Sequence, residues 1–245
     1  MHNKIKQENP LVLNITNYVT MDFVANGLLS LGASPIMSKS IDEIENLLQL
    51  TQSVVINLGT LNAEFIKLCQ HTCKIANQLN LPVVLDPVGA GASQLRTKTS
   101  LSLMNDYKIS IIRGNASEIM ALSDFSHKTK GVDSRIQTED VIEQAKLISK
   151  HYDSALIVSG KVDLVIDQDL MSELHCGSDL MPMITGTGCL HTAVIAAFHA
   201  IHKNRFEAAK AATLFYGHCG EKAAQNAKGP GTFRSQFLDA LYEKN

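Results

Sequence analysis

Residues 184–198 read Ile184-Thr185-Gly186-Thr187-Gly188-Cys189-Leu190-His191-Thr192-Ala193-Val194-Ile195-Ala196-Ala197-Phe198. A turn of small residues here leads directly into an apolar helix. Glycines in such a turn let the backbone approach a ligand closely, and the free N–H groups at the start of a helix attract an anion. The stretch therefore predicts a helix that begins near Thr187, with a phosphate-binding turn in front of it.

One reactive side chain, the thiol of Cys189, falls in the first turn of this helix. The positive end of a helix lowers the pKa of a thiol from its ordinary value of about 8.5, so we expect a lowered pKa for Cys189. An anion site and a candidate base in one segment indicate phosphoryl transfer to a small molecule. The alternative is that the turn only packs a helix against a sheet and that Cys189 is a small core residue.

Outward from this segment, short β-rich runs alternate with longer helical patterns along the 245 residues. Strand runs such as Val83-Val84-Leu85 are almost wholly apolar, which is typical of strands covered on both faces. The alternation predicts an α/β fold with a central, mostly parallel sheet and helices on both of its faces, in a single domain over residues 1–245. Residues 155–167, with Gly160-Lys161 at their middle, predict an antiparallel hairpin at one edge of the sheet.

The expected elements follow the hydrophobic periodicity of each segment. The predicted strands are Leu11–Ile15, Ser34–Met37, Val54–Leu58, Val83–Asp86, Ile109–Arg113, Ala155–Ser159 and Leu164–Asp167. The predicted helices are Thr20–Gly32, Ile41–Leu50, Ala63–Leu79, Thr138–His151, Thr187–Ile201, Phe206–Ala227 and Phe233–Tyr242, with a further helix after Asn115.

The composition narrows the functional classes. A net charge of −2 with no basic stretch, and aromatic residues at 5% with no Trp, argue against a nucleic-acid-binding protein. The five cysteines are odd in number and form no C-x-x-C motif, which fits a reducing compartment better than a disulfide framework or a zinc site. The N-terminus is polar, and no apolar run approaches the length of a membrane helix. We expect a cytoplasmic protein without a nucleic-acid or membrane partner.

Polar side chains gather where the predicted strands end. Asn17 follows the first strand, Asp86 ends another, and Arg113-Gly114-Asn115 and Ser159-Gly160-Lys161 follow two more. Ligands of open parallel sheets bind at the carboxyl ends of the strands, so we expect these residues to share one site. Each also has a local interpretation, for example Asn115 as the cap of the helix that follows it.

Two of these tips carry carboxylates that suit magnesium. Mg²⁺ is often held by one or two carboxylates together with waters and substrate phosphates, and Asp86 and Glu118 supply two such groups. A guanidinium such as that of Arg113 contacts phosphate in a bidentate manner. The alternatives are that Asp86 is a turn carboxylate before Pro87 and that Glu118 is an ordinary acid in the first turn of a helix.

The chain resembles the hydroxyethylthiazole kinase family of the ribokinase-like superfamily, almost from end to end. The resemblance is carried by Ile15-Thr16-Asn17-Tyr18-Val19, residues 25–37, Leu85-Asp86-Pro87-Val88-Gly89-Ala90-Gly91-Ala92, Arg113-Gly114-Asn115-Ala116-Ser117-Glu118-Ile119, Thr185-Gly186-Thr187-Gly188-Cys189 and Gly229-Pro230-Gly231-Thr232-Phe233. It implies a ribokinase-like fold without a separate lid domain. It also implies ATP-dependent phosphorylation of the primary alcohol of 4-methyl-5-(2-hydroxyethyl)thiazole in thiamine salvage, with Mg²⁺.

The resemblance also implies roles for the acceptor side of the site. Related sugar and pyrimidine kinases end this motif in Gly-x-Gly-Asp with the Asp as base, whereas Cys189 stands at that position here, as in the thiazole kinases. We expect Cys189 to be a weak base and the backbone amides around Gly186 and Gly188 to stabilise charge. Met37 and Gly186 correspond to thiazole-contacting positions, and we expect Asn17 to bind the same substrate.

On the nucleotide side, Arg113 and Ser159 correspond to ATP-contacting positions, and we expect Asn115 to join them. The resemblance further implies a homotrimer in which a neighbouring subunit completes the thiazole pocket. One departure concerns Leu13, because members of the family often carry His there. If that His lines the pocket, recognition of the ring differs in this chain.

Four other functions are less well supported by the sequence. A hydroxymethylpyrimidine kinase and a dehydratase that repairs hydrated nicotinamide cofactors share the scaffold, but both normally keep the Asp that Cys189 replaces. A ligand-binding module without catalysis would make the placement of Asp86, Glu118 and Cys189 a coincidence. An oxidoreductase is poorly supported, because no G-x-G-x-x-G follows the first strand.

Overall fold

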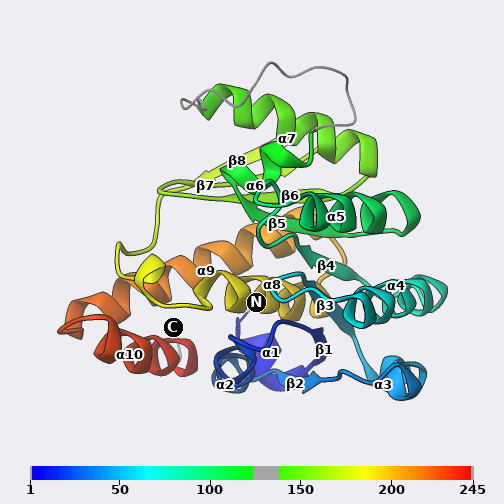
Figure 1. Cartoon of the computed structure of the whole chain (residues 1–245). Coiled ribbons are helices and arrows are strands. Elements are labelled where there is room, and N and C mark those ends of the chain that lie inside the picture. The colour runs from blue at the N-terminus through cyan, green and yellow to red at the C-terminus, as the bar shows by residue number, and fades with distance from the viewer. Residues whose placement is uncertain (1, 124–137, 244–245) are drawn as a thin grey trace.

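The computed structural model describes residues 2–123 and 138–243. Within these ranges the strands form one eight-stranded sheet in the order β2-β1-β3-β4-β5-β6-β7-β8 (Figure 1). The strands are β1 (Leu11–Ile15), β2 (Ser34–Met37), β3 (Ser53–Asn57), β4 (Val83–Asp86), β5 (Ile111–Asn115), β6 (Ala155–Ser159), β7 (Asp163–Asp167) and β8 (Leu170–Leu174). All pairings from β2 to β6 are parallel, and those of β7 with β6 and with β8 are antiparallel.

The predicted hairpin of β6 and β7 is therefore confirmed, but its predicted place at the edge of the sheet is wrong. The chain turns at Gln168, which has a φ of 56°, and returns as β8, which is the edge strand. The sequence of β8 did not predict a strand, because its first residues are exposed and it lacks an apolar run. An edge strand faces solvent, so its hydrophobic pattern is weak.

Helices cover both faces of the sheet, as predicted. The helices are α1 (His2–Glu8), α2 (Met21–Leu31), α3 (Ile44–Leu50), α4 (Ala63–Gln78), α5 (Gln94–Asp106), α6 (Ala116–Ala121), α7 (Thr138–Tyr152), α8 (Thr187–Ile201), α9 (Arg205–Asn226) and α10 (Pro230–Tyr242), with 3-10 turns η1 (Ile41–Glu43) and η2 (Met181–Met183). One buried cluster joins α1, α2, α8, α9 and α10 to one face, and a second joins α3 to α7 to the other (Figure 1). Neighbouring strand residues such as Val54 and Val55 belong to different clusters, as the pleat of a strand requires.

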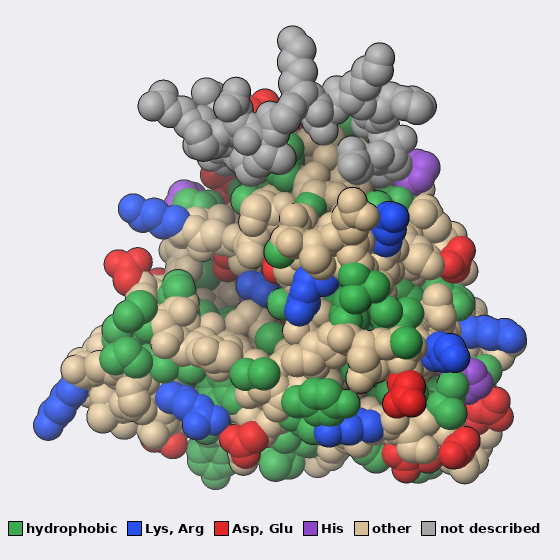
Figure 2. All heavy atoms as spheres, viewed as in Figure 1, with side chains coloured by type: hydrophobic (Ala, Val, Ile, Leu, Met, Phe, Trp, Pro, Cys, Tyr) green, Lys and Arg blue, Asp and Glu red, His purple; other side chains and the backbone are tan. Residues whose placement is uncertain are grey.

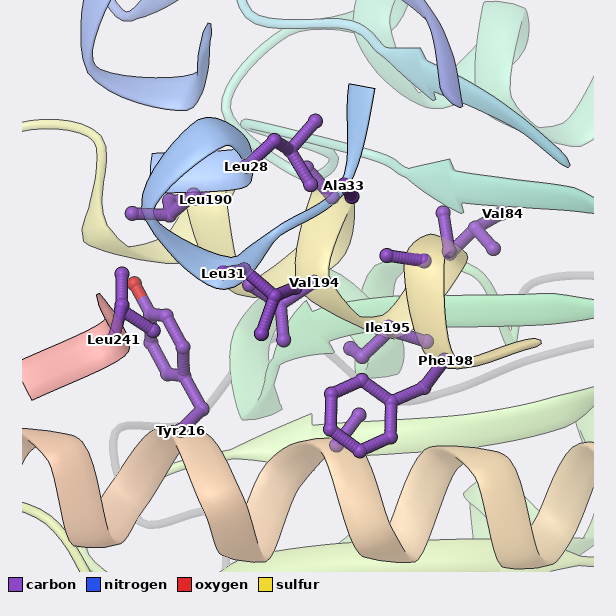
Figure 3. Close-up of a cluster of buried hydrophobic side chains, with 14 of the residues drawn as sticks. Leu28, Leu31, Ala33, Val84, Leu190, Val194, Ile195, Phe198, Tyr216 and Leu241 are labelled. Atoms are coloured by element: carbon purple, nitrogen blue, oxygen red, sulfur yellow. The ribbon is translucent and has the colours of Figure 1, made fainter. Parts of the chain in front are cut away.

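Helix α8 is the central element of the first cluster. Its side chains Leu190, Val194 and Phe198 pack among residues of α2 and α9 (Figure 3). A Cβ on Gly27 of α2 would lie 2.3 Å from Leu190 Cδ1, so glycine is required where α2 approaches α8. The helix begins at Thr187 and ends at Ile201, as the sequence predicts. Its burial on all sides holds the preceding glycine turn in place.

Other differences have simple physical reasons. Helices α1 and α5 were not predicted, because each turns few apolar residues toward the core; Ile5 is the buried apolar residue of α1. The helix expected over residues 41–50 divides into η1 and α3. Leu13 is fully buried in the cluster beneath α3 to α7, so its side chain packs in the core rather than around a ligand. Among the described residues, no helix has the length and apolar character that crossing a membrane demands.

Candidate active site

The carboxyl ends of β1, β3, β4, β5 and β6 lie side by side, as the parallel order of these strands requires. Asn57 at the end of β3 is in register with Asp86 at the end of β4, and Asn115 of β5 is in register with Ser159 of β6. The loop after β1 brings Asn17 to the same edge, where its amide contacts Asn57. The predicted gathering of polar strand tips is therefore observed.

The glycine turn before α8 has a backbone that a larger residue would disturb. Gly186 is the N-cap and has a φ of +100°, and a Cβ there would lie 2.9 Å from Cγ2 of Thr20. The hydroxyl of Thr187 donates to the Met181 carbonyl at 2.8 Å and fixes the turn from within. The N–H groups of Gly188 and Cys189 lie in the first turn of α8, where a helix offers no acceptor. This end of the helix is suited to binding a phosphate.

Cys189 lies beside the end of β1. Asn17 Nδ2 donates to Cys189 Sγ at 3.3 Å. Burial raises the pKa of the Cys189 thiol, and the negative charge of Asp86 raises it further, whereas hydrogen bonds from Thr20, Asn17 and Asn57 act in the opposite direction. The expected lowering of the Cys189 pKa by the helix terminus is thus wrong, because burial and a nearby carboxylate dominate.

Asp86 is a buried carboxylate whose two oxygens have different hydrogen-bond partners. Its Oδ2 accepts from Asn57 Nδ2 at 2.9 Å and from Thr192 Oγ1 at 2.8 Å. Its Oδ1 is buried and has no hydrogen-bond partner among the described residues. Burial raises the pKa of Asp86 to about 6; Arg113, 4.0 Å away, opposes the rise, and Glu118 adds to it. Asp86 therefore lies where a cation or a proton would be stabilised.

Arg113 connects the strand ends to the glycine turn. Its Nε donates to Ser159 Oγ at 3.0 Å. A Cβ built on Gly188 would lie 2.6 Å from Nη1 of Arg113, so the guanidinium lies directly against the first turn of α8. A guanidinium, a hydroxyl and two free backbone N–H groups thus face one small region, and all of them favour anions.

Asn115 and Glu118 form a capping box at the start of α6. The Asn115 side chain accepts from the Glu118 N–H at 2.9 Å, and Glu118 Oε2 accepts from the Asn115 N–H at 2.9 Å. The other carboxylate oxygen, Oε1, accepts from the N–H of Gly89 at 2.8 Å and so ties α6 to the loop after β4. The local capping interpretation is therefore confirmed, and any ligand role of these two residues is additional to it.

A cavity of about 1050 Å³ opens beside these groups, large enough for a nucleotide. Figure 2 shows it as a hollow with basic and acidic side chains inside. The lining includes Arg113, Asn115, Ser159, Lys161 and Gly188. Among the described residues, Asn17, Met37, Cys189, Asp86 and Glu118 are outside that lining.

The acceptor-side residues lie on the other side of the turn. Met37 ends β2, is half-buried, and packs against the same buried cluster as Cys189. Asn17 is bonded to Cys189, whereas the structure records no such bond between Met37 and these two residues within the described ranges. The predicted nucleotide residues thus share a cavity, and the predicted thiazole residues lie outside its lining.

Asp86 and Glu118 are the two carboxylates of this site that could hold Mg²⁺. No group of three or more His, Cys, Asp or Glu side chains that could hold a metal exists in residues 2–123 and 138–243. Mg²⁺ commonly uses only one or two carboxylates and takes its other ligands from water and phosphate. The unpartnered Oδ1 of Asp86 and the nearby Glu118 carboxylate fit that pattern.

Sequence reasoning missed three residues of this site. Asn57 stands at the end of an apolar strand, and only its register with Asp86 reveals the pairing. Thr192 lies one helical turn after Gly188, so its spacing from the glycine turn could have predicted that it lies on the same face of α8. Tyr216 of α9 donates its hydroxyl to the Thr187 carbonyl at 2.7 Å and stacks on His191, a contact that no local pattern indicates.

Comparisons with known proteins show which family and fold the chain resembles. A model of the hydroxyethylthiazole kinase family matches residues 2–244. The hydroxyethylthiazole kinase of Brachyspira hyodysenteriae is 43% identical over 240 residues, which are 98% of this chain and 90% of that protein. The structure of a hydroxyethylthiazole kinase protein from Pyrococcus horikoshii OT3 is 35% identical with a TM-score of 0.91, over 100% of this chain and 92% of the other. A ribokinase-like superfamily protein from Enterococcus faecalis V583 is 11% identical and shares the fold, with a TM-score of 0.70 over 96% of this chain and 88% of its own.

Proposed function

The chain belongs to the hydroxyethylthiazole kinase family, and on that premise we propose how its own residues carry out the reaction. The reaction is the phosphorylation by ATP of the primary alcohol of 4-methyl-5-(2-hydroxyethyl)thiazole, a step of thiamine salvage. The observation that carries the assignment is the contact of Arg113 with Gly188. The next residue is Cys189, whose sulfur accepts a hydrogen bond from Asn17. An anion site and a proton acceptor then stand on consecutive residues.

The triphosphate of ATP binds in the cavity beside β5 and β6. Arg113 and Ser159 contact it, and Asn115 lies at the cavity wall with its side-chain oxygen engaged in the helix cap. The N–H groups of Gly188 and Cys189 face the phosphoryl group in transfer and stabilise the charge on its oxygens. Such fixed donors commonly supply the largest part of catalysis in phosphoryl transfer.

The thiazole alcohol binds on the opposite side of the glycine turn. Met37 supplies a polarizable apolar surface for the ring, and Asn17 and the backbone of Gly186 complete the acceptor side. Gly186 can lie this close to Thr20 because it has no side chain. Cys189 accepts the hydroxyl proton as the new bond to phosphorus forms. The raised pKa of Cys189 leaves little thiolate at neutral pH, so only a small fraction of the protein has a sulfur able to accept the proton. A loose transition state needs little proton removal early, which makes this small fraction sufficient.

Magnesium is assigned to Asp86 and Glu118. An ion held there would offset the negative charge of the triphosphate. The unpartnered oxygen of Asp86 and its pKa of about 6 support this assignment, because a cation favours the ionised carboxylate. Glu118 keeps its capping bonds, so its ligand role is restricted to the remaining lone pairs or to a bridging water.

The proposal includes a homotrimer of cytoplasmic single-domain subunits in which a neighbour completes the thiazole pocket. The exposed apolar side chains of Tyr18 and Val19, directly after Asn17, support an interface at this edge. All five cysteines carry free thiols.

The test is ADP release in a coupled assay, with the thiazole alcohol, the hydroxymethylpyrimidine alcohol and hydrated NADH offered in parallel. We expect ADP formation that depends on the thiazole alcohol and exceeds that with either alternative. ADP formation with one of the alternatives and none with the thiazole would overturn the proposal and favour the corresponding kinase or dehydratase.

A further inference from the structure

Asn57 joins the two chemical groups of the site through one side chain. It ends β3 and is fully buried. Its Nδ2 donates to Asp86 Oδ2 at 2.9 Å, and its Oδ1 accepts from Asn17 Nδ2 at 2.8 Å. The N–H of Gly59 also donates to Oδ1, at 3.0 Å. Asn57 thus lies between the carboxylate assigned to magnesium and the amide that contacts Cys189.

These bonds determine the orientation of the Asn57 amide. The carbonyl oxygen faces two donors, from Asn17 and Gly59, while the amino group faces the acceptor Asp86. Reversing the amide would place donor against donor and acceptor against carboxylate. A buried polar group that loses its partners costs about 1–3 kcal/mol, so the observed orientation is strongly preferred.

The orientation of Asn57 in turn sets that of Asn17. Asn17 Nδ2 has two N–H groups, and one is taken by Asn57 Oδ1 while the other points to Cys189 Sγ. Its Oδ1 accepts from the N–H and hydroxyl of Thr20, both at 3.1 Å. An acceptor at position 57 therefore acts together with the two Thr20 donors to keep the amino side of Asn17 against the sulfur.

We infer that Asn57 is a positioning residue for the phosphoryl transfer, which orients Asn17 toward the Cys189 sulfur and holds Asp86 in register with it. The inference rests on the proposed role of Cys189. Asn57 also acts on the Cys189 sulfur directly, since a hydrogen bond from its side chain lowers the pKa of that thiol. Its effect on turnover passes through the sulfur, and removing the sulfur removes most of that effect.

A double-mutant cycle tests this coupling. We expect Asn57→Ala to lower kcat about tenfold or more in the wild-type background and less than about twofold in the Cys189→Ala background. Thr192→Val is the matched control, because Thr192 donates to the same oxygen of Asp86 but makes no bond to Asn17. Its effect on kcat is expected to be similar in both backgrounds, as for a residue that acts independently of the sulfur.

A second readout does not require turnover. Iodoacetamide labelling at one fixed pH, followed by mass spectrometry of the peptides, compares Cys189 with Cys176, a half-buried thiol that lines the cavity and makes no recorded hydrogen bond with Asn57. Asn57→Ala is expected to slow labelling of Cys189 at least about threefold, because the donor to the sulfur is no longer held in place, while Cys176 and the Thr192→Val protein react as before. Asn57→Ser, which keeps a donor and an acceptor, should recover part of the rate and replaces Asn57→Ala if that protein fails to fold.

The outcomes separate this inference from the proposed function. Equal losses of kcat in both backgrounds, or unchanged labelling of Cys189, would overturn the positioning role of Asn57. Full kcat in Cys189→Ala would instead overturn the assignment of Cys189 as base. The labelling result then still decides whether Asn57 orients the sulfur.

Discussion

The side-chain amide of Asn17 donates to the sulfur of Cys189 at 3.3 Å, although the two residues lie 172 positions apart in the chain. A donor directed at sulfur favours the thiolate, whereas burial and the charge of Asp86 favour the thiol. Burial and the charge of Asp86 outweigh the hydrogen bond, so Cys189 is mostly protonated at neutral pH. The proton acceptor of the site is therefore rarely in its thiolate form at neutral pH, and its neighbours set how often it is.

The first prediction concerns Cys189. Cys189→Ala should lower kcat about 10²–10⁴-fold without abolishing activity, since general-base help has that magnitude and the charge-stabilising donors remain. Cys189→Asp should preserve or raise activity at neutral pH, because a carboxylate is ionised there. Wild-type activity should rise with pH above neutrality as the thiolate forms, and the Asp variant should show a flatter profile. Steady-state kinetics across pH 6–9 measures all three proteins.

Cys219→Ala is the control for this series, because it removes a buried thiol that lies on α9 and bonds to the Ala240 carbonyl. It is expected to leave the shape of the pH profile unchanged. A fully active Cys189→Ala protein would show that another group accepts the proton.

The second prediction uses the contact between Gly188 and Arg113. An alanine at position 188 would place its Cβ 2.6 Å from Arg113 Nη1, so the guanidinium has to move. The backbone at Gly188 is helical and the side chain that moves is flexible, so folding should be unaffected. We expect KM for ATP to rise about tenfold with little change in KM for the thiazole, measured by ADP release. Gly231→Ala, where no atom lies within 4 Å of the added Cβ, should behave as wild type.

The third prediction concerns the stability contributed by Asp86. The folded-state pKa of about 6 lies above the ordinary value of 3.8, so the folded chain binds more protons between these values than the unfolded chain. The free energy of unfolding should therefore fall, through this group, as pH rises from about 4 to about 6. Asp86→Asn removes this dependence, and above pH 6 it should be as stable as wild type or more stable by on the order of 1 kcal/mol, while losing activity.

Thermal unfolding of both proteins at pH 4, 5, 6 and 7, without metal, provides the measurement. The difference in Tm should shift in favour of Asp86→Asn as pH rises. A variant that is equally destabilised at every pH would mean that Asp86 is stabilised in its charged form by contacts such as that with Arg113.

How far the sequence predicts this site is clear from α8. Glycines before an apolar run are local signals, and they placed the start of the helix at Thr187 correctly. The strand tips at Asp86, Arg113 and Ser159 could also be predicted, because parallel strands end at one edge. The pKa of Cys189 could not, since it depends on burial and on Asp86, which is 103 positions away in the chain.

The elements that escaped prediction lack a strong pattern of their own. Strand β8 is an exposed edge, and α5 turns Thr99 and Ser100 toward the core together with Leu103 and Met104. Asn57 is a similar case, because its neighbours in β3 are apolar and its role appears only through contacts with Asn17 and Asp86. Such positions are defined by tertiary contacts rather than by local periodicity.

The fourth prediction separates the two roles of Glu118. Glu118→Gln keeps one acceptor for the N–H groups of Gly89 and Asn115, so we expect a loss of stability of about 1 kcal/mol from weakened capping. If Glu118 also holds magnesium, the concentration of Mg²⁺ for half-maximal activity should rise several-fold. Glu207, the third residue of α9, is the matched control, and Glu207→Gln should leave the magnesium titration unchanged. An unchanged titration in Glu118→Gln itself would restrict Glu118 to the helix cap.

The fifth prediction concerns assembly. Val19 is 70% exposed and follows the loop that holds Asn17, and Leu29 of α2 is 59% exposed. Large apolar side chains at such exposure favour an interface, here the one proposed to complete the thiazole pocket. Val19→Asp should convert a trimer to monomers in light scattering and raise KM for the thiazole, while direct binding of ATP stays unchanged because Val19 is not among the residues that line its cavity. Leu147→Asp on α7, also exposed, is the control and should stay trimeric. A Val19→Asp protein with an unaltered mass and unaltered KM would place the interface elsewhere, and a monomeric wild type with full activity would show that one chain forms the whole pocket.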